Sequence, residues 1–242
     1  MVAGAAVVAL CSGCSGPARD STYPSRVAVF GDSLANQAAP YYRSLIHATT
    51  VTWLSYNSYG GTAICDWLPA MRRVAATDHP DAVEIEFSGN AFTPCMTGDY
   101  PPSAAFYNKY RADAETAVGI FVSVGARVIL IGAPITRSQQ GTPNWDTLDS
   151  EYAQIAKADP AHVSYVDAGA AVEGPGHRYV QTLPCLAHEP CNGPVVDGVR
   201  SNIVRSPDGV HFCPIVSNTG RCPVYASGAF RFAEVMVKAL RE

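Results

Sequence analysis

Three side chains that together could attack a carbonyl carbon stand far apart in this chain. Ser33 lies in the stretch GDSL, directly after a short apolar run. His211 lies in the stretch SPDGVHFC, with Asp208 three residues before it. A serine hydroxyl becomes a nucleophile when a base takes its proton and a third group orients that base. A Pro-Asp-Gly turn can bring the Asp208 carboxylate to the Nδ1–H of His211, which leaves Nε2 free for the serine.

Each of these stretches also has a purely structural interpretation. Asp and Ser are preferred residues at helix N-termini, and Pro-Asp-Gly is a common surface turn. Taken alone, each stretch is more often structural than catalytic. Two other serine-enzyme classes do not fit. The G-x-S-x-G motif of α/β hydrolases is absent, and the order of GDS, aspartate and histidine along the chain is the reverse of that in trypsin-like proteases.

The elements that would position these residues follow an alternating pattern. Apolar, β-branched runs predict five strands, and between them lie segments of helical character. This alternation predicts a parallel sheet covered by helices on both faces, which is a three-layer α/β/α domain. Ligands of such sheets bind beyond the carboxyl ends of the strands, and Ser33 follows the first strand. The predicted strands are 26–30, 51–56, 82–87, 127–132 and 163–167, and the predicted helices are 34–47, 66–77, 104–124, 145–158 and 224–241.

The remaining sequence predicts one domain without a linker. The segment 172–222 is rich in Pro, Gly and Cys and shows no period, so we expect a long loop there. The chain has 242 residues, 48% hydrophobic and 16% charged, which is a globular composition of suitable size for one domain over 23–242. The net charge of −4 and the absence of a long basic run argue against a nucleic-acid partner.

The N-terminal residues and the cysteines indicate export. Residues 1–22 start with a small, apolar stretch that is typical of an export signal, and Cys14 in CSGC resembles the acylated cysteine of a lipoprotein leader. Both interpretations of this leader stay open. Six further cysteines allow 15 disulfide connectivities, of which the sequence alone selects none. Short spacing favours Cys185–Cys191 and Cys213–Cys222, which would leave Cys65 to pair with Cys95. Outside the leader, no C-x-x-C pair meets a second pair or a histidine pair at zinc spacing, so no metal is expected.

Four of these stretches together resemble the SGNH hydrolases, also called GDSL esterases. They are GDSL near the start, a glycine after the second strand in YGGT, an asparagine after the third strand in SGNA, and the late D-x-x-H. They occur in the family's order over residues 27–213. The resemblance implies an SGNH/flavodoxin-like fold and a serine esterase that hydrolyses acyl or acetyl esters through an acyl-enzyme, without a cofactor.

The resemblance also implies a role for each matching residue. Ser33 matches the nucleophile, His211 the general base and Asp208 the residue that orients the base. The oxyanion hole would be formed by the backbone N–H of Ser33, the backbone N–H of Gly60 and the side-chain amide of Asn90, with Gly61 as the alternative if the register shifts by one. If the loops after Gly60 and Asn90 meet at one oxyanion, a Cys65–Cys95 bond would brace them, and a Cys213–Cys222 bond would hold the base.

The substrate remains open at this point. The family's third block usually reads G-x-N-D, whereas this chain has Ser88-Gly89-Asn90-Ala91, so the local loop and the subfamily differ. We expect a monomer that acts on a small ester, a lipid or an acylated glycan, and that meets a membrane only through a lipid anchor at Cys14. The alternatives are an O-acyltransferase that uses the same triad and a non-catalytic binding protein of the same fold. Six aromatic residues near the motif loops could line a glycan or acyl site or could be ordinary packing: Trp53, Trp67, Tyr56, Tyr59, Phe92 and Tyr100.

Overall fold

The structure is a computed structural model that describes residues 23–96, 98, 100–142, 147–215 and 222–241. The predicted leader, with Cys11 and Cys14, lies outside these residues. Five parallel strands form the central sheet in the order β2-β1-β3-β4-β5. These strands are β1 (Arg26–Gly31), β2 (Trp53–Ser58), β3 (Ala82–Glu86), β4 (Arg127–Ile131) and β5 (Val163–Val166).

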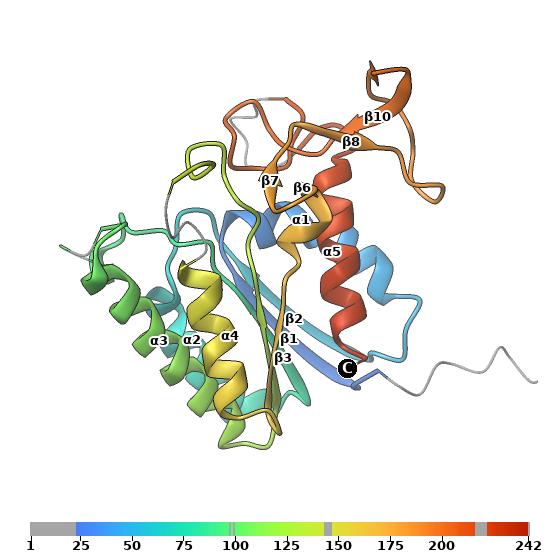
Figure 1. Ribbon diagram of the computed structural model, residues 1–242. Coiled ribbons are helices and arrows are strands. Elements are labelled where there is room, and N and C mark those ends of the chain that lie inside the picture. Colours follow the sequence, from blue (N-terminus) through green and yellow to red (C-terminus); the bar gives the residue numbers. More distant parts are fainter. Residues whose placement is uncertain (1–22, 97, 99, 143–146, 216–221, 242) are drawn as a thin grey trace, which may run out of the picture.

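Helices cover both faces of this sheet, which confirms the predicted three-layer α/β/α architecture (Figure 1). Helices α1 and α5 pack together on one face, and α2, α3 and α4 pack on the other. The ends of the helices lie within a few residues of the predicted ones. Their bounds are α1 (Ser33–Ile46), α2 (Ile64–Asp78), α3 (Ala104–Val122), α4 (Thr147–Ala158) and α5 (Ser227–Ala239), with short 3₁₀ turns at Pro94–Met96 and Gly169–Val172.

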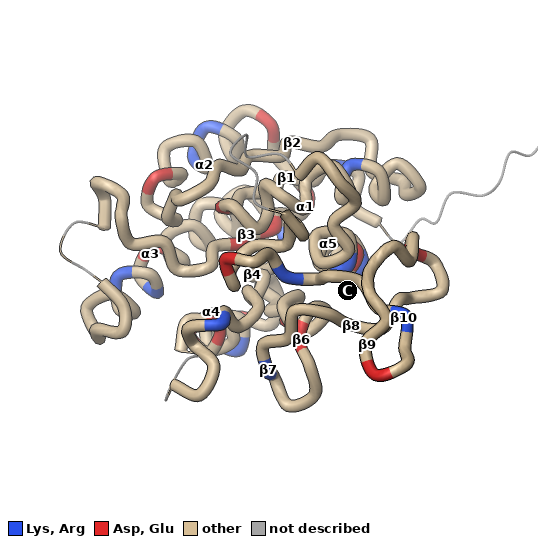
Figure 2. The backbone as a smooth tube through the Cα atoms, turned by 90° about the horizontal axis from the view of Figure 1, so that it is seen from above, with Lys and Arg blue, Asp and Glu red and all other residues tan. Residues whose placement is uncertain are grey.

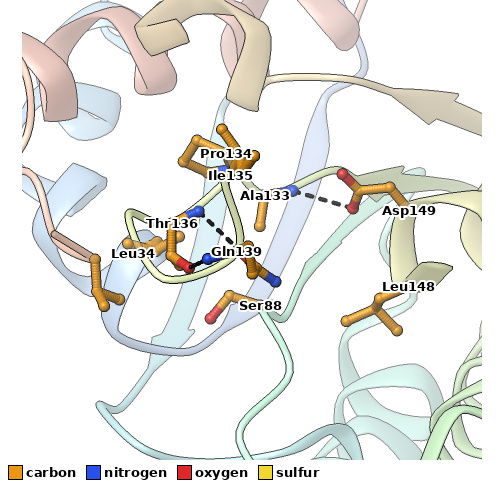
Figure 3. A pocket seen from close by; sticks show the side chains of 10 residues that line it. Leu34, Ser88, Ala133, Pro134, Ile135, Thr136, Gln139, Leu148 and Asp149 are labelled. Atoms are coloured by element: carbon orange, nitrogen blue, oxygen red, sulfur yellow. Dashed lines mark hydrogen bonds between the residues drawn. The ribbon is translucent and has the colours of Figure 1, made fainter. Parts of the chain in front are cut away.

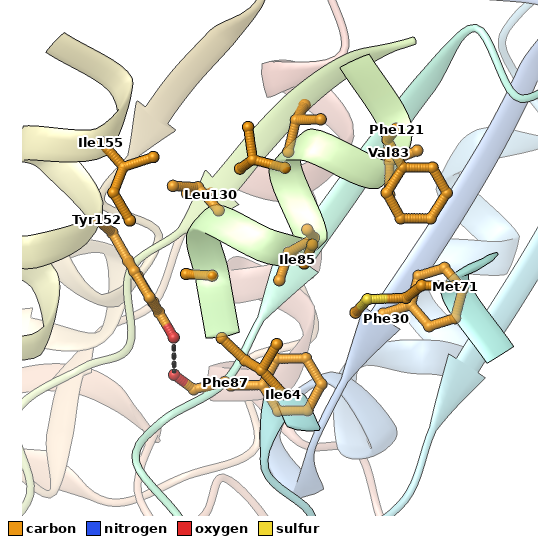
Figure 4. Close-up of a cluster of buried hydrophobic side chains, with 14 of the residues drawn as sticks. Phe30, Ile64, Met71, Val83, Ile85, Phe87, Phe121, Leu130, Tyr152 and Ile155 are labelled. Atoms are coloured by element: carbon orange, nitrogen blue, oxygen red, sulfur yellow. Dashed lines mark hydrogen bonds between the residues drawn. The ribbon is translucent and has the colours of Figure 1, made fainter. Parts of the chain in front are cut away.

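The core has two halves because the side chains of each strand alternate between the faces of the sheet. On β1, Ala28 and Phe30 belong to the half under α2, α3 and α4, whereas Val27 and Val29 belong to the half under α1 and α5. Figure 4 shows the first half, in which the Tyr152 hydroxyl donates a 3.1 Å hydrogen bond to the Phe87 carbonyl. Buried side chains on both faces fix the sheet, and thereby the positions of the loops that leave it.

The strand order defines where a ligand would bind. In a doubly wound sheet of order 2-1-3-4-5, the connections from β1 and β3 run to opposite faces, and a crevice opens between the carboxyl ends of these two strands. Ser33 follows β1 and Asn90 follows β3. Two of the residues predicted to form the site therefore flank the topological switch point of the sheet.

The segment 172–222 differs from the long loop expected there. It contains a two-stranded sheet and a three-stranded antiparallel sheet of order β8-β10-β9. These strands have two to five residues, too few for a hydrophobic period to be visible. The pairing of β9 and β10 follows from the Asp197-Gly198 turn, where both residues have positive φ, 49° and 79°. The strands are β6 (Glu173–Gly174), β7 (Arg178–Tyr179), β8 (Thr182–Pro184), β9 (Val195–Val196) and β10 (Val199–Ile203).

A buried ion pair attaches this segment to α5. Arg231 on α5 donates to the Glu189 carboxylate and to the Pro184 carbonyl, and both side chains are nearly inaccessible to solvent. The three predicted disulfides are present in the structure, and Cys185–Cys191 and Cys213–Cys222 lie in or beside this segment. Side chains and disulfides, rather than long strands, therefore hold it in place.

Candidate active site

The predicted nucleophile lies in a tight turn between β1 and α1. A Cβ on Gly31 would lie 2.4 Å from the Ala35 Cβ and 2.9 Å from the Glu86 carbonyl, so only glycine fits between strand and helix. Asp32 caps the helix by accepting a 3.0 Å hydrogen bond from the Leu34 N–H. Ser33 is the first residue of α1, where free N–H groups and the positive end of the helix dipole favour an anion.

Asp32 is fully buried and organises the loop that follows β3. Its Oδ2 accepts hydrogen bonds from the Ser88 N–H (2.8 Å), the Ser88 hydroxyl (2.6 Å) and the Asn90 side-chain amide (2.8 Å). The residue beside the predicted nucleophile therefore fixes the loop of the predicted oxyanion donor. Ser88 replaces the glycine of the family's third block, and its hydroxyl supplies one of these bonds.

A second buried carboxyl group, that of Glu86 at the end of β3, faces Asp32. Burial, and after it the charge of Asp32, raise the pKa of Glu86 well above its usual range. Burial also raises the pKa of Asp32, but hydrogen bonds from Ser88 and Leu34 oppose this effect. The Glu86 carboxyl group accepts from the N–H groups of Ala35 (3.0 Å) and Asp32, whereas the Asp32 carboxylate accepts four hydrogen bonds. The proton of the pair therefore resides on Glu86, and the negative charge on Asp32.

The two other predicted oxyanion residues lie close to this turn. A Cβ placed on Gly60 would lie 3.6 Å from the Ser33 Cβ, so the β2–α2 loop contacts the start of α1. The Asn90 amide nitrogen donates to Asp32 and also, at 3.2 Å, to the Thr62 carbonyl. Asn90 thus links the loop after β3 to the loop that carries Gly60. Its longer bond, to Thr62, is the one that an oxyanion would have to replace.

The disulfide Cys65–Cys95 joins these same two loops. Cys65 lies in the first turn of α2, and Cys95 lies in the 3₁₀ turn that follows Asn90. The Tyr110 hydroxyl on α3 adds a 2.8 Å hydrogen bond to the Asn90 carbonyl. The backbone around Asn90 is therefore fixed both by the disulfide to α2 and by the hydrogen bond from α3.

The predicted base and its orienting residue form a hydrogen-bonded pair. Nδ1 of His211 lies 2.8 Å from Oδ2 of Asp208. Oδ1 of Asp208 accepts the backbone N–H groups of Val210 (2.8 Å) and His211 (3.0 Å), which forms a closed turn. Partial burial acts to raise the pKa of Asp208, but these N–H groups and the His211 ring outweigh it and lower this pKa to about 2. Asp208 is therefore ionised over the whole range in which a histidine titrates.

The His211 ring and the nucleophile turn lie on the same edge of the sheet. The His211 ring is close enough to Asp32 that a positive charge on it would lower the pKa of that carboxylate. Within the described residues, no hydrogen bond joins the Ser33 hydroxyl to the His211 ring. Catalytic hydrogen bonds are often long in the absence of substrate and tighten when it binds.

The six aromatic residues divide into two groups. Trp53 lies at the start of β2, at the opposite edge of the sheet, and Trp67 and Tyr56 pack against the core. The other three are solvent-exposed on the motif loops, and the rings of Phe92 and Tyr100 lie 5.4 Å apart between centroids, tilted by 37° to each other. The exposed fractions are 68% for Tyr59, 91% for Phe92 and 46% for Tyr100.

A small cavity of about 30 Å³ lies between the loop after β4 and the nucleophile turn (Figure 3). Leu34, Ser88 and Val210, which are neighbours of predicted catalytic residues in sequence or space, contribute to its lining. Its polar groups bond within the protein: the Ser88 hydroxyl binds Asp32, and the Asp149 carboxylate accepts the Ala133 N–H at 3.3 Å. Ser33, His211, Gly60 and Asn90 do not line this cavity, so it borders the candidate site without containing it.

Among the described residues, neither the distribution of charge nor the metal-ligating side chains indicate a second candidate site. In Figure 2, basic and acidic residues are scattered over the elements, and neither sign gathers in one place. Within the described ranges, no cluster of three or more His, Cys, Asp or Glu residues has the arrangement to hold a metal ion. None of the helices in the same part of the chain is long and apolar enough to cross a membrane.

Sequence reasoning missed several residues that support this site. Arg205 is fully buried, and its guanidinium donates to the Ile135 carbonyl (2.8 Å) and to the Val210 carbonyl (2.7 Å), next to His211. Glu86 was also missed, although the alternation in AVEIEF places two acids on one face of a strand that should be buried on both. That pattern is a sequence signal for buried carboxyl groups.

Solved structures of known proteins share this fold at low sequence identity. TesA has a TM-score of 0.58 and 15% identity, covering 88% of this chain and 97% of TesA. A lipase/acylhydrolase from Enterococcus faecalis has a TM-score of 0.57 and 18% identity, covering 89% of this chain and 95% of its own. A catalytic mutant of an acetylxylan esterase from Geobacillus stearothermophilus has a TM-score of 0.58 and 14% identity, covering 90% of this chain and 95% of its own. The resemblance to GDSL-type hydrolases is thus confirmed for the fold.

Two sequence comparisons complete these findings. Residues 26–217 match a family described as "Protein of unknown function (DUF459)". No curated protein matches the chain by sequence.

Proposed function

Because the chain belongs to the DUF459 family of proteins of unknown function and shares the fold of GDSL-type esterases, we propose that it is a serine esterase. Ser33 is the nucleophile, His211 the general base and Asp208 the residue that orients the base. The substrates are carboxylic esters with acyl or acetyl groups. The observation that carries this proposal is the 2.8 Å bond between Asp208 and His211 at the sheet edge where α1 begins with Ser33.

The proposed reaction proceeds in two steps. The Ser33 oxygen attacks the ester carbonyl carbon while Nε2 of His211 takes the hydroxyl proton, and the carbonyl oxygen becomes an oxyanion. The tetrahedral intermediate collapses, and the alcohol leaves with the proton from His211. Water then attacks the acyl-enzyme with His211 again as base, which releases the acid and restores Ser33.

Three donors would stabilise the oxyanion in both steps. They are the Ser33 N–H at the start of α1, the Gly60 N–H and the Asn90 amide. The close approach of Gly60 to Ser33 supports the second, and the bond from Asn90 to Asp32 supports the third. The two backbone N–H groups are fixed before the reaction and need no reorganisation as the charge develops, whereas the Asn90 amide would exchange its bond to the Thr62 carbonyl for one to the oxyanion.

The test is a set of p-nitrophenyl esters of rising chain length with the wild-type protein and the Ser33→Ala variant. We expect wild-type hydrolysis, its loss in the variant, and labelling of Ser33 alone by a fluorophosphonate. Hydrolysis at the wild-type rate by Ser33→Ala, or labelling of a different serine, would contradict the proposal.

A second candidate function is O-acyl transfer to a glycan by the same triad. The exposed rings of Tyr59, Phe92 and Tyr100 on the motif loops support a glycan as substrate or acceptor, because aromatic faces can pack against sugar rings. Acetylated xylan and acetylated peptidoglycan, offered with and without an acceptor sugar, distinguish the two reactions by whether free acetate or an acetylated acceptor accumulates. Phe92→Ala should weaken turnover of the polymers and leave turnover of p-nitrophenyl acetate unchanged.

The cellular setting belongs to the same proposal. We propose an exported monomer that is secreted or attached to the cell envelope, with a lipid anchor at Cys14 as its only membrane contact and no nucleic-acid partner. Three disulfides support export, since such bonds persist in oxidising compartments. Mass spectrometry of the mature N-terminus would detect an acylated Cys14.

A further inference from the structure

A glutamine on α1 connects the helix of the proposed nucleophile to the loop of the proposed base. Gln37 lies four residues after Ser33, which is about one turn of the helix. Its side-chain oxygen accepts the backbone N–H of Phe212 at 2.8 Å and that of Cys213 at 3.1 Å. These are the two residues that directly follow His211.

The backbone on the N-terminal side of His211 is bound by a different residue, Arg205. Arg205 donates to the Val210 carbonyl at 2.7 Å and, through its other terminal nitrogen, to the Ile135 carbonyl at 2.8 Å. The Ser206 N–H donates to the carbonyl of His211 itself at 2.7 Å. Arg205 thus connects the turn to the loop after β4, whereas Gln37 connects it to α1.

From this geometry we propose that Gln37 is a positioning residue, which sets the distance between the Ser33 hydroxyl and the His211 ring. This inference rests on the proposed esterase function. Ser33 and Gln37 belong to one rigid helix, and His211 and Phe212 are adjacent in one tight turn. A bond from Gln37 to the Phe212 N–H therefore fixes the base relative to the nucleophile without touching substrate.

The burial of the donors explains why this contact should be decisive. Phe212 is fully buried and Cys213 nearly so, and a buried N–H without a partner is unfavourable. If the Gln37 oxygen is removed, the turn must shift until these groups find water or another acceptor. A misplacement of about 1 Å in a catalytic group can lower the rate by about 10²-fold.

Two substitutions separate positioning from general stabilisation. Gln37→Leu removes the acceptor and keeps a side chain of similar size, whereas Gln37→Glu keeps an oxygen that can accept both N–H groups. Ser44→Leu places a leucine at an exposed position near the end of the same helix and serves as the control. The measurements are kcat, KM and the pH profile of kcat/KM with p-nitrophenyl acetate, with thermal unfolding of each variant.

We expect Gln37→Leu to lower kcat by about 10–10²-fold with KM within about twofold of wild type, and Ser44→Leu to behave as wild type. Gln37→Glu should retain most of kcat, and its carboxylate should move the acid limb of the profile to higher pH by favouring the protonated base. A folded Gln37→Leu variant with wild-type kcat, or a Gln37→Glu variant as impaired as Gln37→Leu, would overturn the inference while the esterase function stands. If the wild-type protein neither hydrolyses esters nor reacts with fluorophosphonate, the function itself is refuted, and the role of Gln37 with it.

Discussion

The two halves of the candidate site are held in different ways. Ser33, Gly60 and Asn90 follow strands of the central sheet, and their positions result from two large core halves. His211 and Asp208 lie after the short strands of the segment 172–222, where a few side chains and disulfides fix the described part of the chain. The proposed nucleophile is therefore positioned by the whole fold and the proposed base by individual contacts. We expect substitutions in the two regions to have different consequences, which the following experiments test.

The largest effect should come from replacing Ser33 or His211, the residues of the two regions that we propose to act together in the reaction. Ser33→Ala and His211→Ala should each lower kcat on the order of 10⁴-fold or more. The double variant should be hardly worse than either single one, because residues that act as a unit are not additive. Steady-state kinetics with a short p-nitrophenyl ester measure this. Multiplicative losses in the double variant would mean that the two residues act independently.

The next largest effect should appear on stability in the C-terminal segment. Glu189→Gln leaves Arg231 buried with its charge uncompensated, which should lower the free energy of unfolding by about 3–5 kcal/mol. Glu151→Gln breaks the more exposed pair with Arg111 (2.7 Å) and should cost less than about 1 kcal/mol. Urea unfolding of both variants measures the difference. Equal losses would show that the Glu189–Arg231 pair does not anchor the segment.

The Glu189 contribution should also depend on pH in a defined direction. Burial acts to raise the pKa of Glu189, but hydrogen bonds from Arg231, Ser227 and the Leu186 N–H outweigh it and lower this pKa to about 2. Because the folded value lies below the usual 4.5, the stabilisation is complete above about pH 4.5 and is lost as the pH falls through about 2. The difference between wild type and Glu189→Gln should shrink in that window.

A smaller effect on activity should follow from loss of one oxyanion donor at the sheet edge. Asn90→Ala should lower kcat by about 10²–10³-fold with little change in KM, because the bond strengthens mainly as charge develops. Thermal unfolding should change less than in Glu189→Gln, since the core halves hold this region. Wild-type kcat in Asn90→Ala would remove Asn90 from the oxyanion hole and leave Gly60 and Ser33 as its donors.

The smallest effect should be a gain in stability inside the sheet. Burial raises the pKa of Glu84 on β3 to about 8, although Tyr42 and Arg127 act against this shift. Because the folded value is raised, stability is highest below about pH 4.5 and falls as the pH rises toward 8. This shift costs about 3 kcal/mol near pH 7, and burial of the glutamine amide would offset part of the gain from removing it. Glu84→Gln should therefore raise the free energy of unfolding near pH 7 by about 1–2 kcal/mol and flatten its dependence on pH. A lower melting temperature at pH 7 would show that the carboxyl group is needed for packing.

The sequence predicted the sheet edge better than the C-terminal segment, for a physical reason. Strands buried on both faces leave continuous apolar runs, and the sheet-edge rule then places Ser33 without any partner being known. The pairing of Asp208 with His211 was also accessible, because a three-residue spacing confines it to one turn.

The contacts that were missed join residues far apart in the chain. Gln37 reaches Phe212 across 175 residues, and Arg205 reaches Ile135 across 70. No periodicity or local motif encodes such pairs, since each joins an ordinary polar side chain to a backbone group of a distant apolar residue. The Asp197-Gly198 turn is different: its hairpin signal was present in the sequence and was obscured by the short strands beside it.

The proton that Glu86 retains has a consequence for catalysis that goes beyond the packing of the turn. Two ionised carboxylates directly beneath the start of α1 would oppose the negative charge that develops on the substrate oxygen. With Glu86 neutral, the reacting oxygen of the proposed mechanism would meet the field of one anion, Asp32, whose charge is spread over four hydrogen-bond donors. The helix N-terminus thus keeps most of its attraction for an anion at the place where Ser33 would create one.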